Sequence, residues 1–173
     1  MTSDIERANR WSIADPDIVL DLTTGRHGAA VVVIDPAGRV LLQQRDDDPP
    51  PEGYGRWAIP GGGSEAGETP RQTALREIEE ETAIRLLTVT YFGSVRVQRH
   101  DERPDSPDLT IHMFFAREDW PESVIVVGEG LAFCYWSAEE SRTLPMNPNG
   151  RHWLEHLLAS DAFHNPAVAE QTT

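Results

Sequence analysis

Residues 62–84 read Gly-Gly-Ser-Glu-Ala-Gly-Glu-Thr-Pro-Arg-Gln-Thr-Ala-Leu-Arg-Glu-Ile-Glu-Glu-Glu-Thr-Ala-Ile. This stretch predicts a helix over about residues 70–82, because its start is clearly marked. Thr69 can accept a hydrogen bond as the N-cap, Pro70 suits the first helical position, and Gln72 completes a capping box.

Three glutamates fall on one side of this predicted helix. At 100° per residue, Glu77, Glu80 and Glu81 occupy about one third of the circumference. Apolar residues such as Ala74 and Ile78 lie roughly opposite and can pack on a sheet. Carboxylates three and four residues apart repel each other, at a cost of about 0.2–0.5 kcal/mol per pair. A divalent cation would remove this repulsion, whereas a solvated acidic face is the alternative for an isolated cluster.

The glutamates also stand at fixed distances from residues upstream of them. Gly62 is followed after five residues by Glu68, and after seven more by Arg76-Glu-Ile-Glu-Glu-Glu-Thr-Ala-Ile84. This pattern resembles the signature of the Nudix hydrolase family, which usually has glycine at the position of Ala83. Glycine there permits the left-handed residue that ends a helix, and alanine would cost about 1 kcal/mol in that conformation. We therefore expect the helix to end differently here, with no ligand lost.

The resemblance to Nudix hydrolases implies a metal-dependent reaction. Members hydrolyse the pyrophosphate linkage of a nucleoside diphosphate bonded to another group, as in a nucleoside triphosphate or an ADP-ribose-like compound. Mg²⁺ or Mn²⁺ neutralises the diphosphate and activates a water, which attacks one phosphorus in line. The implied metal set consists of the Gly62 carbonyl, Glu77, Glu80 and Glu81, with Glu68 supporting the site and Arg76 orienting the glutamates by a salt bridge.

The signature alone does not name the general base. Glu80 could serve, and so could Glu129, which stands in a Val-Gly-Glu-Gly loop before a late strand. The flanking glycines would let this loop swing toward the diphosphate. A turn glutamate between two glycines is the alternative interpretation of Glu129.

The substrate is less well defined by the sequence than the reaction. Tyr54 and Trp57 could stack on a nucleotide base, although a place in the core is the alternative for Trp57. The polar loop at residues 99–108 could border the active site or be solvated only.

Apolar runs along the rest of the chain predict a mixed sheet with helices. Strands are expected at 29–34, 39–45, 57–59, 87–98, 109–116 and 131–136, and a last helix at 148–158. Asp35-Pro-Ala-Gly38 predicts a hairpin between the first two strands. Strands and helices alternate irregularly, which favours a mixed α/β fold. The Nudix resemblance implies an α/β/α sandwich around a mixed β-sheet, and residues 57–62 and 133–140 extend that resemblance over about residues 27–158.

This reading divides the chain into one domain and two flanking segments. Residues 1–25, which are polar apart from the short apolar stretch 18–22, are expected to form an N-terminal extension that adds one strand. Residues 26–160 are expected to form the Nudix hydrolase domain. Residues 161–173 are expected to form a C-terminal tail.

The charge and composition of the chain limit the kinds of partner that we expect. The formal net charge is −14, and all 15 basic residues are arginine. This acidity argues against broad contact with nucleic acid or an anionic membrane. The single cysteine, Cys134, fits a reducing compartment, and neither a membrane-length apolar run nor a signal peptide is present. We expect a cytoplasmic protein that acts on a small nucleotide and forms no stable complex with nucleic acid or membrane. A homodimer is possible.

Two competing functions come from other classes. A non-catalytic Nudix-like nucleotide sensor is the nearer alternative, although such modules usually lack one or more of the signature glutamates, all of which are present here. His152-Trp-Leu-Glu-His156 also has the spacing of an inverted zinc-peptidase motif. Glu170 would be the carboxylate available downstream as a third ligand for that motif. Two histidines on the exposed side of the last helix are the plainer explanation.

Overall fold

A computed structural model describes residues 10–46, 55–97 and 108–165 of the chain. The elements in chain order are β1 (Arg10–Ser12), β2 (Arg26–Ile34), β3 (Val40–Gln44), β4 (Trp57–Ala58), β5 (Gly61–Gly63), α2 (Pro70–Thr82), β6 (Thr90–Val97), β7 (Leu109–Arg117), the 3-10 turn η1 (Glu122–Val124), β8 (Ala132–Trp136), α3 (Ala138–Ser141), α4 (Pro148–Leu158) and α5 (Asp161–His164).

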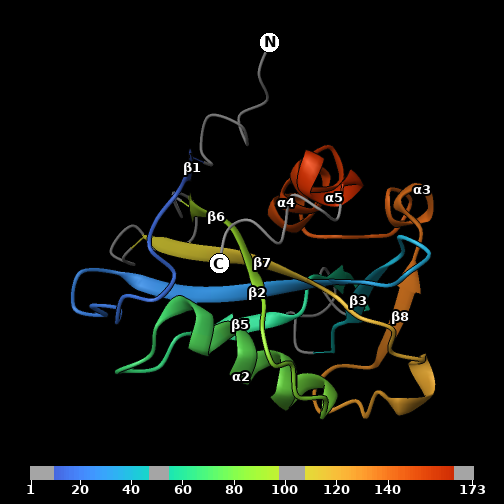
Figure 1. The fold of residues 1–173 in the computed structure, drawn as a ribbon, viewed down its shortest axis with the longest axis horizontal. Coiled ribbons are helices and arrows are strands. Elements are labelled where there is room, and N and C mark those ends of the chain that lie inside the picture. The colour runs from blue at the N-terminus through green and yellow to red at the C-terminus, as the bar shows by residue number, and fades with distance from the viewer. Residues whose placement is uncertain (1–9, 47–54, 98–107, 166–173) are drawn as a thin grey trace.

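The strands form one mixed sheet with helices on both faces. Its order is β1-β6-β7-β2-β3-β4, with β5 added to β2 and β8 added to β3. Strands β2 and β7 pair in parallel, and the other strand pairs are antiparallel. Figure 1 shows α2 on one side of the sheet, with α4 and α5 on the other. The predicted α/β/α sandwich around a mixed sheet is confirmed.

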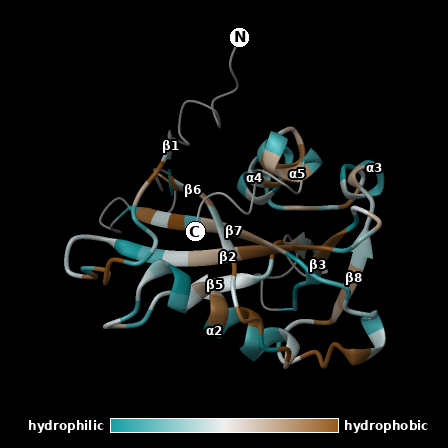
Figure 2. Ribbon diagram, viewed as in Figure 1, coloured by the Kyte–Doolittle hydropathy of each residue, from teal (hydrophilic) through white to brown (hydrophobic). Residues whose placement is uncertain are grey.

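The alternation along β2 explains why both faces of the sheet are covered. Ala29, Val31 and Val33 belong to the buried cluster that includes Ala74 and Ile78 of α2. The intervening residues Ala30, Val32 and Ile34 join Leu154, Leu157 and Leu158 of α4 in the second cluster. Successive side chains of a strand point to opposite faces, so an apolar run such as this one fills two cores. Figure 2 shows the resulting apolar colouring along β2 and β3.

The described part of the N-terminal segment contributes one strand. Residues 10–12 form β1 and pair with β6, whereas residues 18–22 form no strand. The N–H of Leu20 instead donates to the carbonyl of Glu68, and Pro16 accepts from the N–H of Arg71. Residues 16–20 are therefore attached to the start of α2, and Ile18 keeps 62% of its surface exposed.

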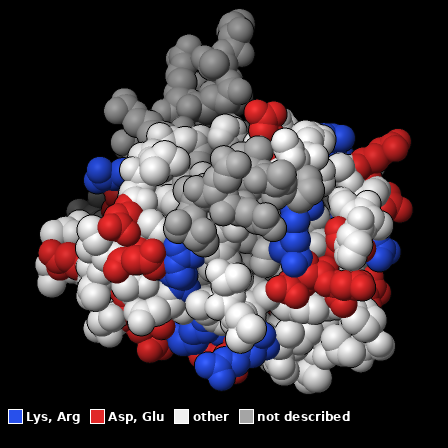
Figure 3. Space-filling model, in the orientation of Figure 1, with Lys and Arg blue, Asp and Glu red and all other residues white. Residues whose placement is uncertain are grey.

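Two features of the surface bear on possible partners. Across residues 10–46, 55–97 and 108–165, every helix falls short of the length and apolar character that a membrane span requires. On the face drawn in Figure 3, acidic and basic side chains lie interspersed.

Candidate active site

The start of helix α2 agrees with the prediction from the sequence, whereas its end does not. The side chain of Thr69 accepts from the N–H of Gln72, and the Gln72 side chain accepts from the N–H of Thr69, which completes the capping box. At the other end Ala83 adopts the left-handed conformation, with φ 56° and ψ 18°. The expectation of a different helix end at Ala83 is therefore wrong: the alanine takes the conformation that usually favours glycine.

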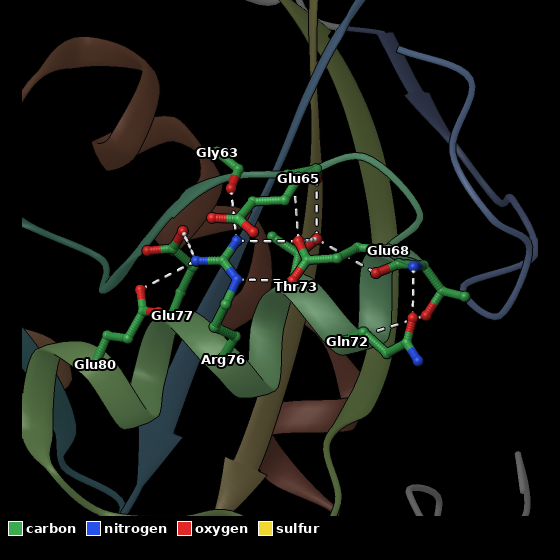
Figure 4. Close-up of polar contacts among 10 residues, drawn as sticks. Gly63, Glu65, Glu68, Gln72, Thr73, Arg76, Glu77 and Glu80 are labelled. Atoms are coloured by element: carbon green, nitrogen blue, oxygen red, sulfur yellow. Dashed lines mark hydrogen bonds and ion pairs between the residues drawn. The ribbon is translucent and has the colours of Figure 1, made fainter.

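Arg76 is the centre of a polar network on the exposed side of α2 (Figure 4). Its Nε donates to Oε1 of Glu68 at 2.7 Å, and its Nη2 donates to Oε2 of the same carboxylate at 3.0 Å. Its Nη1 donates to Glu77 at 2.7 Å and to Glu80 at 3.0 Å. Nη2 also donates to the carbonyl of Gly63 at 2.8 Å. One guanidinium thus holds three of the predicted site glutamates and the glycine-rich strand β5.

The bidentate contact with Arg76 strongly favours the ionised form of Glu68. Hydrogen bonds from the guanidinium, with further donors from Glu65 and Thr73, lower the pKa of Glu68 to about 2. The same contacts raise the pKa of Arg76. Bidentate, charge-assisted hydrogen bonds of this kind are strong and also fix the orientation of the two side chains. Arg76 therefore has the orienting contacts that the Nudix resemblance implies.

Glu77 lies directly against Gly62 of β5. A β-carbon added to Gly62 would stand 2.4 Å from Oε2 of Glu77, a distance that side chains do not tolerate. Burial raises the pKa of Glu77, in spite of its contact with Arg76. The absence of a side chain at Gly62 is thus what lets the Glu77 carboxylate approach the strand.

Glu81 is the most buried of the predicted ligands. Its side chain is 2% exposed, and its Oε2 has no hydrogen-bond partner within the described parts of the chain. Burial and the nearby charge of Glu77 raise its pKa to about 8, against the opposing hydrogen bonds from Gln43 and the main chain of Gly61. A buried carboxylate oxygen without a donor is costly, so this position suits a bound cation.

The predicted ligands are brought together, but Arg76 holds two of them. Within residues 10–46, 55–97 and 108–165, no three His, Cys, Asp or Glu side chains form a group that could hold a metal ion as they stand. Figure 4 shows the guanidinium of Arg76 bound to one oxygen each of Glu77 and Glu80. The side chain of Glu80 is also 55% exposed.

The loop that carries Glu129 is anchored close to Glu81. The N–H of Gly128 donates to the carbonyl of Glu81 at 2.8 Å, and the N–H of Leu131 donates to the carbonyl of Gln44 at 2.7 Å. A β-carbon at Gly128 would stand 2.1 Å from the carbonyl oxygen of Glu80. The absence of a side chain at Gly128 therefore allows the loop to pack closely on α2.

A pocket of about 280 Å³ opens beside Glu129. Its lining residues come from β3 and from the two loops beside it, and they are Gln43, Arg45, Asp46, Gly128, Glu129 and Gly130. The charge of Glu129 acts on both Glu77 and Glu81, which places it near the glutamates of α2. Gln43 was missed by the sequence reasoning, although a polar residue at an inward position of the apolar strand β3 is a signal that could have indicated it.

Of the two residues predicted to stack on a nucleotide base, the structure describes Trp57. Trp57 is 9% exposed and belongs to the core on the α4 side of the sheet. Its ring packs edge-on against Trp136, with the ring centroids 5.1 Å apart. The structure thus gives Trp57 the core position that was its alternative, on the edge strand β4, which pairs with β3. Tyr54 and residues 99–107 lie outside the described residues.

Of the two histidines of the peptidase alternative, His156 packs against aromatic rings. His156 stacks on Trp11, with ring centroids 4.3 Å apart, and it also contacts Phe92. As noted above, no metal-holding group occurs in the described ranges, and Glu170 lies outside them. The motif in α4 therefore attaches β1 and β6 to the last long helix.

Comparison with known proteins agrees with this geometry. A family model described as the NUDIX domain matches residues 25–157. An 8-oxo-dGTP diphosphatase from Proteus vulgaris is 35% identical over 95 residues, which are 54% of this chain and 77% of that protein.

Solved structures share the fold. A MutT NUDIX hydrolase from Burkholderia pseudomallei superposes with a TM-score of 0.60 at 26% identity, over 75% of this chain and 95% of that one. The NUDIX domain of Shewanella oneidensis NrtR, solved as a complex with ADP ribose, gives a TM-score of 0.63 at 19% identity, over 79% of this chain and 90% of that one. The matched family span includes β2, α2 and the Glu129 loop, and the chain belongs to the NUDIX family, as a Nudix pyrophosphohydrolase.

Proposed function

We propose that this chain is a divalent-metal-dependent hydrolase that cleaves the pyrophosphate linkage of a nucleoside diphosphate bonded to another group. The observation that carries the proposal is the carboxylate of Glu81, which is buried, has one oxygen without a hydrogen-bond donor in the described residues, and lies close to Glu77. A helix designed for stability alone would not bury this charge beside another carboxylate.

The residues present fit a hard divalent cation. The donors are all oxygens, which Mg²⁺ and Mn²⁺ prefer. Arg76 contributes one positive charge to the site, which contains several glutamates. Glu77, Glu80, Glu81 and the Gly62 carbonyl would hold the metal, and Glu68 would support it. When bound, the cation neutralises the diphosphate and lowers the pKa of a coordinated water.

The remaining steps fall to the chain's own side chains. Arg76 orients Glu68, Glu77 and Glu80 through four hydrogen bonds. A general base takes the proton of the attacking water. Glu80 already binds Arg76 through Oε2, whereas Glu129 lines the pocket. We therefore propose Glu129 as the base, with Glu80 as the alternative.

The substrate class we favour is a nucleoside triphosphate. The support is the Proteus vulgaris relative, which is an 8-oxo-dGTP diphosphatase. An ADP-ribose-like compound is the second class, and it is the ligand of the Shewanella oneidensis NUDIX domain with the same fold. The cytoplasmic location and the homodimer stay predictions from the sequence.

The test is a screen for phosphate release after addition of inorganic pyrophosphatase or phosphatase. It compares nucleoside triphosphates including 8-oxo-dGTP, nucleotide sugars, dinucleoside polyphosphates and ADP-ribose, each with Mg²⁺, with Mn²⁺ and with excess chelator. We expect turnover of at least one class with metal and none with chelator. A preparation of Glu81→Gln, made identically, controls for contaminating enzymes. Full activity in chelator would contradict the proposal, and ADP-ribose binding without turnover of any compound would favour the sensor.

A further inference from the structure

Gln43 is a buried polar residue in an otherwise apolar strand. It follows Val40, Leu41 and Leu42 in β3 and is 3% exposed. Leu42 belongs to the core on the α4 side, and Leu41 belongs to the core on the α2 side. Because side chains alternate along a strand, Gln43 projects toward α2, where Glu81 lies.

The amide of Gln43 joins two parts of the candidate active site. Its Nε2 donates to the carbonyl of Glu129 at 3.1 Å. The same side chain lies close enough to the Glu81 carboxylate to favour its ionised form, which opposes the rise in the pKa of Glu81. A glutamine amide nitrogen carries two hydrogens, so it can serve both acceptors at once. The loop is packed tightly on this amide, since a β-carbon at Gly130 would stand 3.3 Å from Nε2.

The contacts of the main chain reinforce this link. The N–H of Gly128 donates to the carbonyl of Glu81 at 2.8 Å, so the loop is tied to α2 by its backbone and to the Glu81 side chain through Gln43. A buried amide is costly unless both of its donors are satisfied. An apolar residue would fill the same space without that requirement, so the amide has a role that packing does not explain.

We propose that Gln43 is a positioning residue that fixes the Glu81 carboxylate and the backbone of Glu129 relative to each other. It keeps the Glu81 carboxylate on α2 at a fixed position relative to the loop before β8 that carries Glu129. The inference rests on the proposed function, in which Glu81 binds the cation and Glu129 faces the substrate. Residues that orient metal ligands by hydrogen bonds typically affect metal affinity or activity by 10- to 100-fold.

The experiment compares Gln43→Met with Gln44→Met. Methionine keeps the length of glutamine without a donor, and Gln44 is a matched control because its Nε2 donates to another main-chain carbonyl, that of Gly55. Mn²⁺ affinity is measured by electron paramagnetic resonance on the free protein, and kcat and KM are measured with the best substrate of the screen. Circular dichroism and thermal denaturation verify folding. Gln43→Glu is a second variant, with the same shape but an added charge beside Glu81.

We expect Gln43→Met to weaken Mn²⁺ binding about 10- to 100-fold and to lower kcat more than it changes KM. Gln44→Met should leave Mn²⁺ affinity unchanged, and Gln43→Glu should lower kcat at least as much as Gln43→Met. Gln43→Met combined with Glu129→Gln should lose less activity than the product of the two single losses, because residues that act together are not additive.

The outcomes separate this inference from the function on which it rests. Equal Mn²⁺ affinity and kcat in Gln43→Met and wild type would overturn the positioning role, while metal-dependent turnover by the wild type would still support the hydrolase. Equal losses in Gln43→Met and Gln44→Met would also overturn it, as an effect of packing alone. Multiplicative losses in the double variant would overturn the link to Glu129. A wild type that neither binds Mn²⁺ nor needs metal would overturn both proposals.

Discussion

The carboxylate of Glu77 lies against the α-carbon of Gly62, so closely that a methyl group there would stand 2.4 Å from its Oε2. Helix α2 and strand β5 are thus in contact through a carboxylate on one side and a missing side chain on the other. Gly63, the next residue, has no atom within 4 Å of the place where its β-carbon would lie. The two neighbouring glycines therefore have different reasons to be glycine.

The first prediction uses this difference. Gly62→Ala should displace the Glu77 carboxylate and lower both Mn²⁺ affinity and turnover by about 10-fold or more, because the ligand loses its position. Gly63→Ala should leave both nearly unchanged. Equilibrium Mn²⁺ titrations and initial rates measure the two effects. Equal activity in the two variants would show that the approach of Glu77 to β5 does not matter for the reaction.

The second prediction concerns Glu81 and pH. Its pKa in the folded protein is about 8, raised from 4.5 first by burial and then by the charge of Glu77. The folded state therefore binds this proton more tightly than the unfolded state, and metal-free protein loses stability as the pH rises from about 4.5 to 8. Glu81→Gln removes this loss, so its melting temperature in chelator should exceed that of wild type, by more at pH 8 than at pH 5.

The size and controls of this effect follow from the same residues. One pKa unit is worth about 1.4 kcal/mol, so the gain is at most a few kcal/mol. Glu79→Gln, at an exposed position of the same helix, should show no such dependence on pH. Mg²⁺ should raise the melting temperature of wild type but not of Glu81→Gln, and turnover of the variant should fall by orders of magnitude. A variant less stable than wild type at pH 8 would mean that the carboxylate is structural.

The third prediction tests Glu129 as the general base. Glu129→Gln should reduce kcat by about 10²–10⁴-fold with a smaller change in KM, and the loss should ease at high pH, where hydroxide replaces the base. The pH dependence of kcat measures this directly. Near-normal turnover at every pH would leave Glu80 as the preferred base.

The fourth prediction concerns the end of α2. Ala83 has a φ of 56°, a conformation in which an L-residue is strained. Ala83→Gly should raise the free energy of unfolding by about 0.5–1 kcal/mol, because relief of strain exceeds the added freedom of the unfolded chain. Ala83→Val should lower it, since a branched side chain fits that conformation less well. Urea denaturation gives both values, and neither variant should change Mn²⁺ affinity.

The fifth prediction concerns a buried histidine pair away from the site. Nε2 of His112 lies 3.1 Å from Nδ1 of His27. Burial, with a smaller effect of the His27 charge, lowers the pKa of His112 from 6.5 to about 4. The unfolded chain therefore takes up a proton between pH 6.5 and 4 that the folded chain does not, so stability is full above pH 6.5 and is lost as the pH falls.

A comparison of variants isolates this contribution from that of the carboxylates. His112→Gln should lose less stability between pH 7 and pH 4.5 than wild type does, by up to about 3 kcal/mol. His164→Gln, at an exposed position in α5, should follow wild type. Parallel pH dependences for all three proteins would show that His112 takes up its proton as easily in the folded state as in the unfolded chain.

Features that depend on near neighbours in the chain could be predicted from the sequence. The start of α2 was correct because Thr69, Pro70 and Gln72 act within one turn of the helix. The hairpin at Gly38 was correct because its N–H bonds to Asp35, three residues away. The family resemblance rested likewise on spacings within residues 62–84.

Features that depend on distant contacts were decided by the tertiary structure. The glycines of β5 were not predicted as a strand, because they form one through the edge of β2 that they approach. The position of Trp57 depended on Trp136, and the left-handed Ala83 is held in an environment that outweighs its own preference.

The same distinction holds within the candidate site. The sequence placed Glu77, Glu80 and Glu81 on one helix face, because helical periodicity is a local property. That Arg76 binds the carboxylates of Glu77 and Glu80 at once was not evident from that periodicity. That Gln43 donates to the carbonyl of Glu129 required the packing of β3 and the loop before β8. A hydrogen bond between residues 86 positions apart leaves no periodic trace in the chain. It forms only because a shared core brings its two partners within reach.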